Sequence, residues 1–198
     1  MLKRLALLLV MLELAYLAVF NLALYLPLTQ DLVNRIKPDK FNVSWEQAWT
    51  PWPFRVYARG VAANGQARSQ QWELQTPEAS ASISLFPLLF KRVSLNNIQV
   101  GDVRYYQRPR PKAGKDYSAI RQFFPPVQGR ELETEPPQLA PIKAGKKPWH
   151  VNIRDIQASG RHTLWLYQLQ AKLSGNARTG LSVVTRGGPF SLSRGEVD

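Results

Sequence analysis

The chain has 198 residues and a net charge of +12, and 44% of its residues are hydrophobic, which suits one ordinary domain with accessory segments. The absence of cysteine excludes disulfides and thiolate metal sites. Most of the basic excess lies beyond Lys40 and favours an anionic partner, such as lipid headgroups or an acidic protein.

The first expected element is a transmembrane helix. Residues from Leu5 to Leu28 are almost continuously apolar, and a helix of this length can cross a hydrocarbon layer of roughly 30 Å. Lys3 and Arg4 precede the run, so the N-terminus is expected in the cytoplasm and the rest beyond the membrane. In a bacterium this predicts a single-pass inner-membrane protein whose C-terminal bulk is periplasmic. The helix is expected to stop near Ile36, giving a signal anchor over residues 1–36.

Two features around this run have alternative interpretations. A cleaved signal peptide would also begin with a basic segment, although the apolar run is longer than the 7–15 residues that such signals use. Downstream, Trp45, Trp49 and Trp52 are candidates for contact with the membrane interface, where amphipathic rings are common. The same aromatic residues could instead cap a β core.

Period-two alternation of apolar residues predicts β-strands in two units, 41–106 and 149–198. Asn64-Gly65 predicts a hairpin turn, and the alternation over residues 165–173 predicts one strand. Between the units, residues 107–148 contain eight of the fifteen prolines and predict an insert or linker without sheet structure.

A short phrase occurs twice, as VSLNNIQV at 93–100 and VNIRDIQA at 151–158, with a looser third copy at 56–61. In each full copy the apolar alternation shifts by one residue, at Asn96-Asn97 and at Arg154-Asp155. A bulge or tight bend is therefore expected at both pairs, because it would keep the apolar side chains on one side. We interpret the phrase as a repeated structural unit of an antiparallel sheet.

The expected fold is mainly β: a transmembrane helix followed by an antiparallel, curled sheet, open as a groove or taco-like, with a proline-rich insert. The sheet must curl, close or pair, because no amphipathic helix outside the anchor is long enough to cover its apolar side. Acyl chains would lie against that side. The candidate residues are Ala79, Ala81, Ile83, Leu85, Val93, Leu95, Ile98, Val100, Val151, Ile153 and Ile156.

Two segments behind the N-terminal anchor, TPWPFRVYARGV (50–61) and WELQTPEASASISLFPLLFKRVSLNNIQVGDVRYY (72–106), carry a family resemblance. The sequence resembles the start of AsmA-like proteins, which belong with the TamB-type, bridge-like lipid-transfer proteins of the Gram-negative envelope. The resemblance covers about residues 1–106 and, more weakly, 149–198. It implies an inner-membrane anchor, a periplasmic β-groove with an apolar lumen, and a role in phospholipid transport or outer-membrane biogenesis. Family members are usually several times longer, so a fragment or a short accessory version is expected.

No catalytic motif is found, and no metal or cofactor is expected. His150 and His162 have no second ligand at metal-binding spacing, and no nucleophile elbow, P-loop or dinucleotide-binding pattern occurs. We therefore expect a protein that is not an enzyme, with membrane phospholipid as its partner, a possible second partner in the envelope, and no nucleic acid. The alternative is a bitopic interaction component of a secretion or envelope machine, in which the insert binds a partner.

Overall fold

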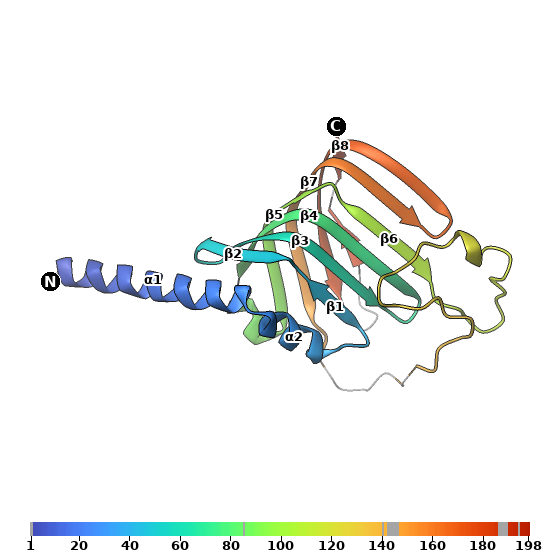
Figure 1. Ribbon diagram of the computed structural model, residues 1–198, viewed down its shortest axis with the longest axis horizontal. Helices are drawn as coiled ribbons and strands as arrows, with labels where there is room; N and C mark the ends of the chain where they lie inside the picture. The colour runs from blue at the N-terminus through green and yellow to red at the C-terminus, as the bar shows by residue number, and fades with distance from the viewer. Residues whose placement is uncertain (1, 85, 140, 142–146, 186–189, 194) are drawn as a thin grey trace.

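A computed structural model describes residues 2–84, 86–139, 141, 147–185, 190–193 and 195–198. The chain begins with α1 (Leu2–Tyr25) and α2 (Pro27–Ile36), and all strands among the described residues then form one ten-stranded sheet (Figure 1). The structure confirms the mainly β fold with an N-terminal apolar helix. The first strands are β1 (Phe41–Ser44), β2 (Gln47–Trp52), β3 (Arg55–Gln66) and β4 (Gln70–Ser84), followed by β5 (Arg92–Gly101) and β6 (Arg104–Pro109). After the insert come β7 (His150–Leu166), β8 (Leu169–Val184), β9 (Phe190–Leu192) and β10 (Glu196–Val197). Two short 3-10 helices are also present: η1 (Phe86–Phe90) between β4 and β5, and η2 (Arg121–Phe123) within the insert.

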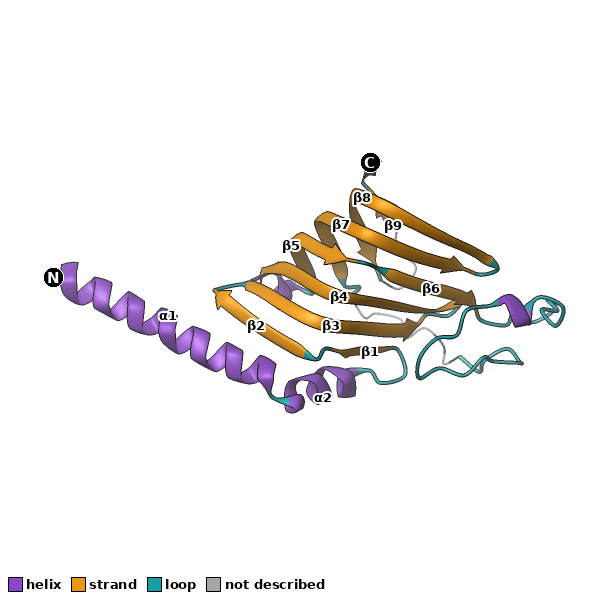
Figure 2. Cartoon of the chain, turned by 45° about the horizontal axis from the view of Figure 1, so that its top comes forward, coloured by secondary structure: helices purple, strands orange, loops and turns teal. Residues whose placement is uncertain are grey.

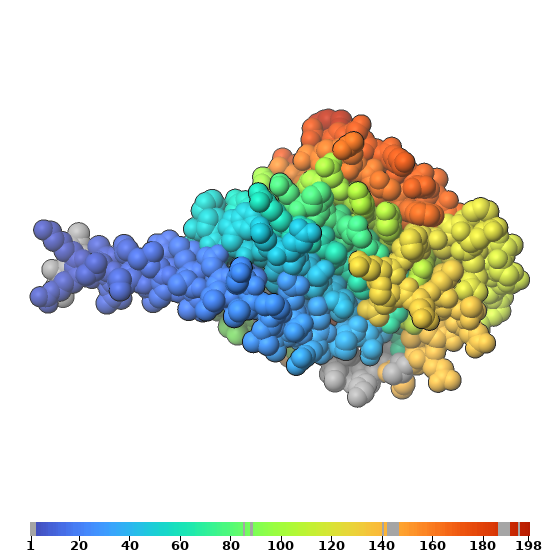
Figure 3. All heavy atoms as spheres, viewed as in Figure 1, coloured from blue at the N-terminus to red at the C-terminus, as the bar shows by residue number. Residues whose placement is uncertain are grey.

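The expected helix is interrupted at Leu26, close to the end of its apolar run. Proline has no N–H to donate and therefore suits the first turn of a helix, and Pro27 is the first residue of α2. Helix α2 ends at Ile36, as predicted. The segment Lys3–Tyr25 is long and apolar enough to cross a membrane, and none of its side chains is buried in the protein. Figure 3 shows α1 projecting from the body of the molecule.

The sheet is antiparallel except at β7, so the prediction of a wholly antiparallel sheet was too simple. Both β5 and β6 run parallel to β7. The first part of β7 pairs with β5, and its last part pairs with β6. A parallel neighbour requires a long connection that returns the chain to the starting end of the sheet. Residues 107–109, predicted to belong to the insert, instead form the end of β6 and pair with β4. The rest of the proline-rich insert, between β6 and β7, provides this connection.

The repeated phrase pairs with itself across β5 and β7, where Val93 lies opposite Val151. The expected bulges are present: Asn97 and Asp155 have φ values of 48° and 55°, with a register shift at each position. Gly60, at the equivalent position of the third copy, has a φ of 59°. Gly, Asn and Asp are the residues that tolerate this left-handed conformation best. The three copies therefore share a backbone feature as well as a sequence pattern.

The strands bend over along a line that crosses the sheet (Figures 1 and 2). Asp102, between β5 and β6, lies along this line with Gly160 of β7 and Gly175 of β8, and all three have positive φ. The Asp102 carboxylate accepts a hydrogen bond from the Arg161 backbone N–H at 2.7 Å and occupies the space that a Cβ on Gly160 would need. Glycine at position 160 therefore allows the close approach of Asp102 at the bend.

Two turns differ from the sequence prediction. Strand β3 continues through Asn64-Gly65 to Gln66, and the turn lies at 67–69. Gly65 instead faces the ring of Trp72, where an added Cβ would meet a ring carbon at 2.7 Å. Residues 165–173 are not one strand either, because the chain turns after Leu166 at Tyr167, which has a φ of 57°.

Candidate functional site

The candidate groove residues gather on one face of β4, β5 and β7. Directly opposed residues on neighbouring strands project to the same face, and Leu95 lies opposite both Ile83 and Ile153. The bulges at Asn97 and Asp155 preserve this face along each strand. We call it the apolar face; its members are Ala79, Ala81, Ile83, Val93, Leu95, Ile98, Val100, Val151, Ile153 and Ile156. The remaining candidate, Leu85, lies outside the described residues.

Within the part of the chain that the structure describes, no second layer covers the apolar face. All ten of its side chains are only half-buried. Among the described residues, the buried apolar side chains are Phe124, Pro125 and Val127, all in the insert. The helices lie elsewhere, with α1 against β2 and α2 against β1. A sheet normally buries its apolar side against a second layer, so this face is open to an apolar ligand.

The opposite side of the same strands is polar. It carries Ser80, Ser82 and Gln99 alongside Arg55, a residue that is only 8% exposed. Arg55 donates hydrogen bonds to Ser80 Oγ at 2.7 Å, to Ser82 Oγ at 3.2 Å and to the carbonyl of Asn97 at 2.6 Å. This arginine therefore links β3 and β4 to the bulge of β5 from the polar side.

Two hollows flank the bend. The first, of about 790 Å³, is lined by Gln75, Arg104 and Lys172 among others. The second, of about 780 Å³, is lined mainly by polar residues and touches only Ala79 and Val100 of the apolar face. The apolar candidates therefore form an open surface and do not line either of these hollows as a set.

The insert is docked on the sheet by a buried arginine that the sequence reasoning missed. Arg108 donates to Gln71 Oε1 at 2.8 Å and to the carbonyls of Pro125, Arg130 and Glu131 at 3.2, 2.9 and 2.7 Å. Burial lowers the pKa of the Arg108 guanidinium, and the charge of a neighbouring arginine lowers it further, while two nearby glutamates oppose the shift.

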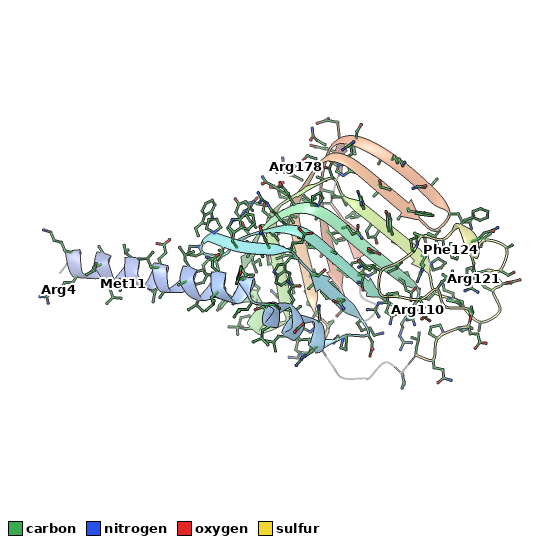
Figure 4. All side chains as sticks on the ribbon, in the orientation of Figure 1. Arg4, Met11, Arg110, Arg121, Phe124 and Arg178 are labelled. Atoms are coloured by element: carbon green, nitrogen blue, oxygen red, sulfur yellow. The ribbon has the colours of Figure 1, made fainter. Side chains whose placement is uncertain are left out.

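A second arginine holds the same segment. Arg110 forms an ion pair with Glu133, with Nη2 and Oε1 2.6 Å apart. Figure 4 shows Arg110 with Arg121 and Phe124 at the end of the sheet far from α1. No sequence signal distinguishes these arginines from the solvated charges around them.

Side-chain amides from the two helices cover the first edge of the sheet. Asn21 of α1 donates to the carbonyl of Thr50 and accepts from its N–H, both at 2.9 Å. Asn34 of α2 does the same with Val43, at 2.9 and 2.8 Å. Each amide pairs with the strand as a neighbouring strand would, which satisfies backbone groups that an edge otherwise exposes.

The three candidate interface tryptophans lie on or beside β2. Trp45 Nε1 donates to the carbonyl of Leu24 at 3.1 Å, so its ring rests against the end of α1. Trp49 stacks on Tyr57, with ring centroids 5.8 Å apart. Trp52 lies at the end of β2, and 53% of it is exposed.

His150 and His162 both lie on β7. His162 Nδ1 accepts a hydrogen bond from the Val103 N–H at 3.2 Å, and His150 begins β7. Within the described part of the chain, no three His, Cys, Asp or Glu side chains are grouped so that they could hold a metal ion.

Comparison of the chain with protein-family models, with curated proteins and with solved structures finds no match. Three features distinguish this molecule from a closed β domain. They are the open apolar face, the exposed helix α1 and the sheet edge that is hydrogen-bonded to the amides of Asn21 and Asn34.

Proposed function

We propose that this chain is a membrane-anchored, lipid-handling module that holds acyl chains on the apolar face of its sheet, in the manner of AsmA-like proteins. One observation carries the proposal: three strands place their apolar side chains on one face, and none of these side chains is buried. Transfer of apolar surface out of water contributes about 25 cal/mol per Å². An acyl chain would therefore bind along this face without any specific polar contact.

The anchor sets the proposed location. With Lys3 and Arg4 on the cytoplasmic side, α1 spans the inner membrane and the sheet lies in the periplasm. The partners are membrane phospholipids, and the role is phospholipid transport or outer-membrane biogenesis. No catalytic step is proposed.

The hydrogen bonds at the first edge of the sheet support this arrangement because they join the anchor helix α1 to β2. The Asn21 amide holds β2 directly against α1, so the position of the sheet relative to the anchor is fixed. On the polar side, Gln99 and Gln157 are exposed to water, whereas Arg55 and Ser80 are buried. Acyl chains could then leave the bilayer along one side of the sheet while the other side stays hydrated.

The test compares adjacent residues on opposite faces of β5. Ile98→Asp places a carboxylate on the apolar face, whereas Gln99→Asp places the same group on the exposed polar face. A carboxylate without a partner costs several kcal/mol against hydrocarbon, and about 1.4 kcal/mol corresponds to tenfold in affinity. Native mass spectrometry of the full chain in mild detergent should show a drop of tenfold or more in bound phospholipid for Ile98→Asp only.

Both variants retain α1, so lipid that surrounds the anchor is common to them. Ala177→Asp, on the same face of β8 opposite Ala158, is a second variant, and circular dichroism checks that each remains folded. Equal lipid occupancy in folded Ile98→Asp, Ala177→Asp and Gln99→Asp proteins would contradict acyl-chain binding by this face. In that case the alternative, an interaction component of an envelope machine, would be favoured.

A further inference from the structure

We propose that the tip of the β2–β3 hairpin, residues 50–54, is embedded in the lipid leaflet beside α1 and forms a second membrane contact. This inference rests on the proposed anchorage by α1 and adds the place where the sheet meets the bilayer. The partner is the hydrocarbon and interfacial region of the leaflet that surrounds the C-terminal half of α1.

Three contacts show that the hairpin runs back along α1 toward its N-terminus. Trp45 bonds to Leu24 of the helix, and the next contact along the chain joins Thr50 to Asn21. The last joins the Phe54 N–H to Tyr16 Oη at 3.3 Å, with the two rings 5.7 Å apart. Figure 1 shows the tip of the hairpin beside the C-terminal turns of α1.

The position of Tyr16 within α1 sets the depth of the tip. Tyr16 lies nine residues before Tyr25, which corresponds to about 13 Å along the helix axis. If the tip were in water, the membrane-crossing part of α1 would end near Tyr16. Only the segment 5–16 would then remain, about 18 Å long, and it could not cross about 30 Å of hydrocarbon. A spanning α1 therefore places the tip inside the leaflet.

The backbone chemistry of the tip suits a water-free environment, in which every unpaired N–H is costly. Pro51 and Pro53 have no N–H to satisfy. The Thr50 N–H is bonded to Asn21 and its hydroxyl donates to the carbonyl of Trp52 at 2.7 Å, while the Phe54 N–H is bonded to Tyr16. Thr50, the one polar side chain in the tip, is only 3% exposed.

Several exposed side chains at this end are apolar, and the exposed basic pair Lys91 and Arg92 directly follows η1. Trp52 and Phe54 are 53% and 48% exposed at the tip. Nearby, η1 exposes Phe86 and Leu89, at 72% and 78%. This 3-10 helix follows the end of β4, where the Ile83 N–H donates a hydrogen bond to the Phe54 carbonyl at 2.8 Å. Tryptophan is typical of the membrane interface, and phenylalanine and leucine are favoured in the apolar region beside it.

The tip adjoins the start of the apolar face. Ile83, which is bonded to Phe54 through the backbone, belongs to that face and lies opposite Leu95. An embedded tip would therefore place one end of the apolar face at the leaflet. An acyl chain could move from the bilayer to the sheet without crossing water.

The absence of cysteine allows a direct test with single spin labels on the full chain. Trp52→Cys and Phe54→Cys place the label at the tip, and Leu12→Cys marks the middle of α1. Tyr167→Cys, in the exposed turn between β7 and β8, is the matched control at the far end of the sheet. Each labelled protein is reconstituted in vesicles of phosphatidylethanolamine and phosphatidylglycerol. The accessibility of the label to oxygen and to a water-soluble nickel chelate is then measured.

Labels at positions 52 and 54 should be several-fold less accessible to the nickel chelate than the label at 167, and more accessible to oxygen, as at position 12. Nickel accessibility at 52 and 54 equal to that at 167, with position 12 protected, would overturn the embedded tip and leave the anchor intact. Exposure of position 12 to the chelate would overturn both. A protected tip combined with unchanged lipid binding in Ile98→Asp would support the tip and contradict only the acyl-binding proposal.

Discussion

Substitution of Arg108 by leucine is expected to release the proline-rich insert from the sheet. The side chain, in a residue only 3% exposed, donates to three carbonyls of the insert and to Gln71. A buried carbonyl left without a donor costs about 1–3 kcal/mol. The total cost of three such carbonyls would exceed the free energy that holds a short segment docked on the sheet. The insert should detach and hydrate these carbonyls, while the sheet remains folded.

Hydrogen exchange and limited trypsin digestion measure this release directly. The amides of Phe124 and of residues 127–131 should lose protection in Arg108→Leu, and cleavage after Arg121 and Arg130 should become faster. Arg104→Leu is the matched control, because Arg104 lies on the same strand and the same face but is exposed. Unchanged protection of the insert in Arg108→Leu would show that the insert is held by other contacts.

Substitution of Asn21 by leucine should destabilise the protein even though it makes α1 more apolar. The Asn21 amide satisfies both the N–H and the carbonyl of Thr50, which is only 3% exposed. Leaving these two groups without partners costs about 1–3 kcal/mol each. Thermal unfolding in detergent should shift to lower temperature, and the Thr50 amide should lose its protection from hydrogen exchange.

Leu22→Ala provides the control for this substitution. Leu22 is next to Asn21 on α1, and 60% of it is exposed, so its truncation removes mainly exposed apolar surface and no side-chain hydrogen bond. Its unfolding temperature should match that of the native chain. An Asn21→Leu protein that retains both its unfolding temperature and the protected Thr50 amide would contradict the role of the amide in holding the edge.

The sequence was sufficient to predict the repeat and its bulges because both follow from local alternation. A shift of one residue at Asn97 or Asp155 would turn every later apolar side chain to the wrong face, and only a few residue types tolerate the backbone that corrects it. The apolar set on β4, β5 and β7 was predictable for the same reason. Its residues share a face through pairings that preserve their alternation.

Features that depend on distant contacts were not predictable. Gly65 appeared to mark a turn, but its lack of a side chain serves the packing of Trp72. Tyr167 forms a turn although the sequence there has no Gly, Asn or Asp to indicate one. The parallel pairing of β5 with β7 and the burial of Arg108 both require knowledge of where the insert returns the chain. Composition indicated that the insert lacks strands, but it could not indicate that the insert is docked.

The most direct test of the central claim asks which face of the sheet touches lipid. A photoreactive benzophenone side chain is placed at Ala158, on the apolar side of β7 opposite Val100, or at the adjacent Ser159, which is exposed. The full chain is then irradiated in membranes, and crosslinked phospholipid is identified by mass spectrometry. Lipid adducts at position 158, with few or none at 159, are the predicted result. Equal labelling at both positions, or adducts only at 159, would contradict acyl-chain binding by the apolar face.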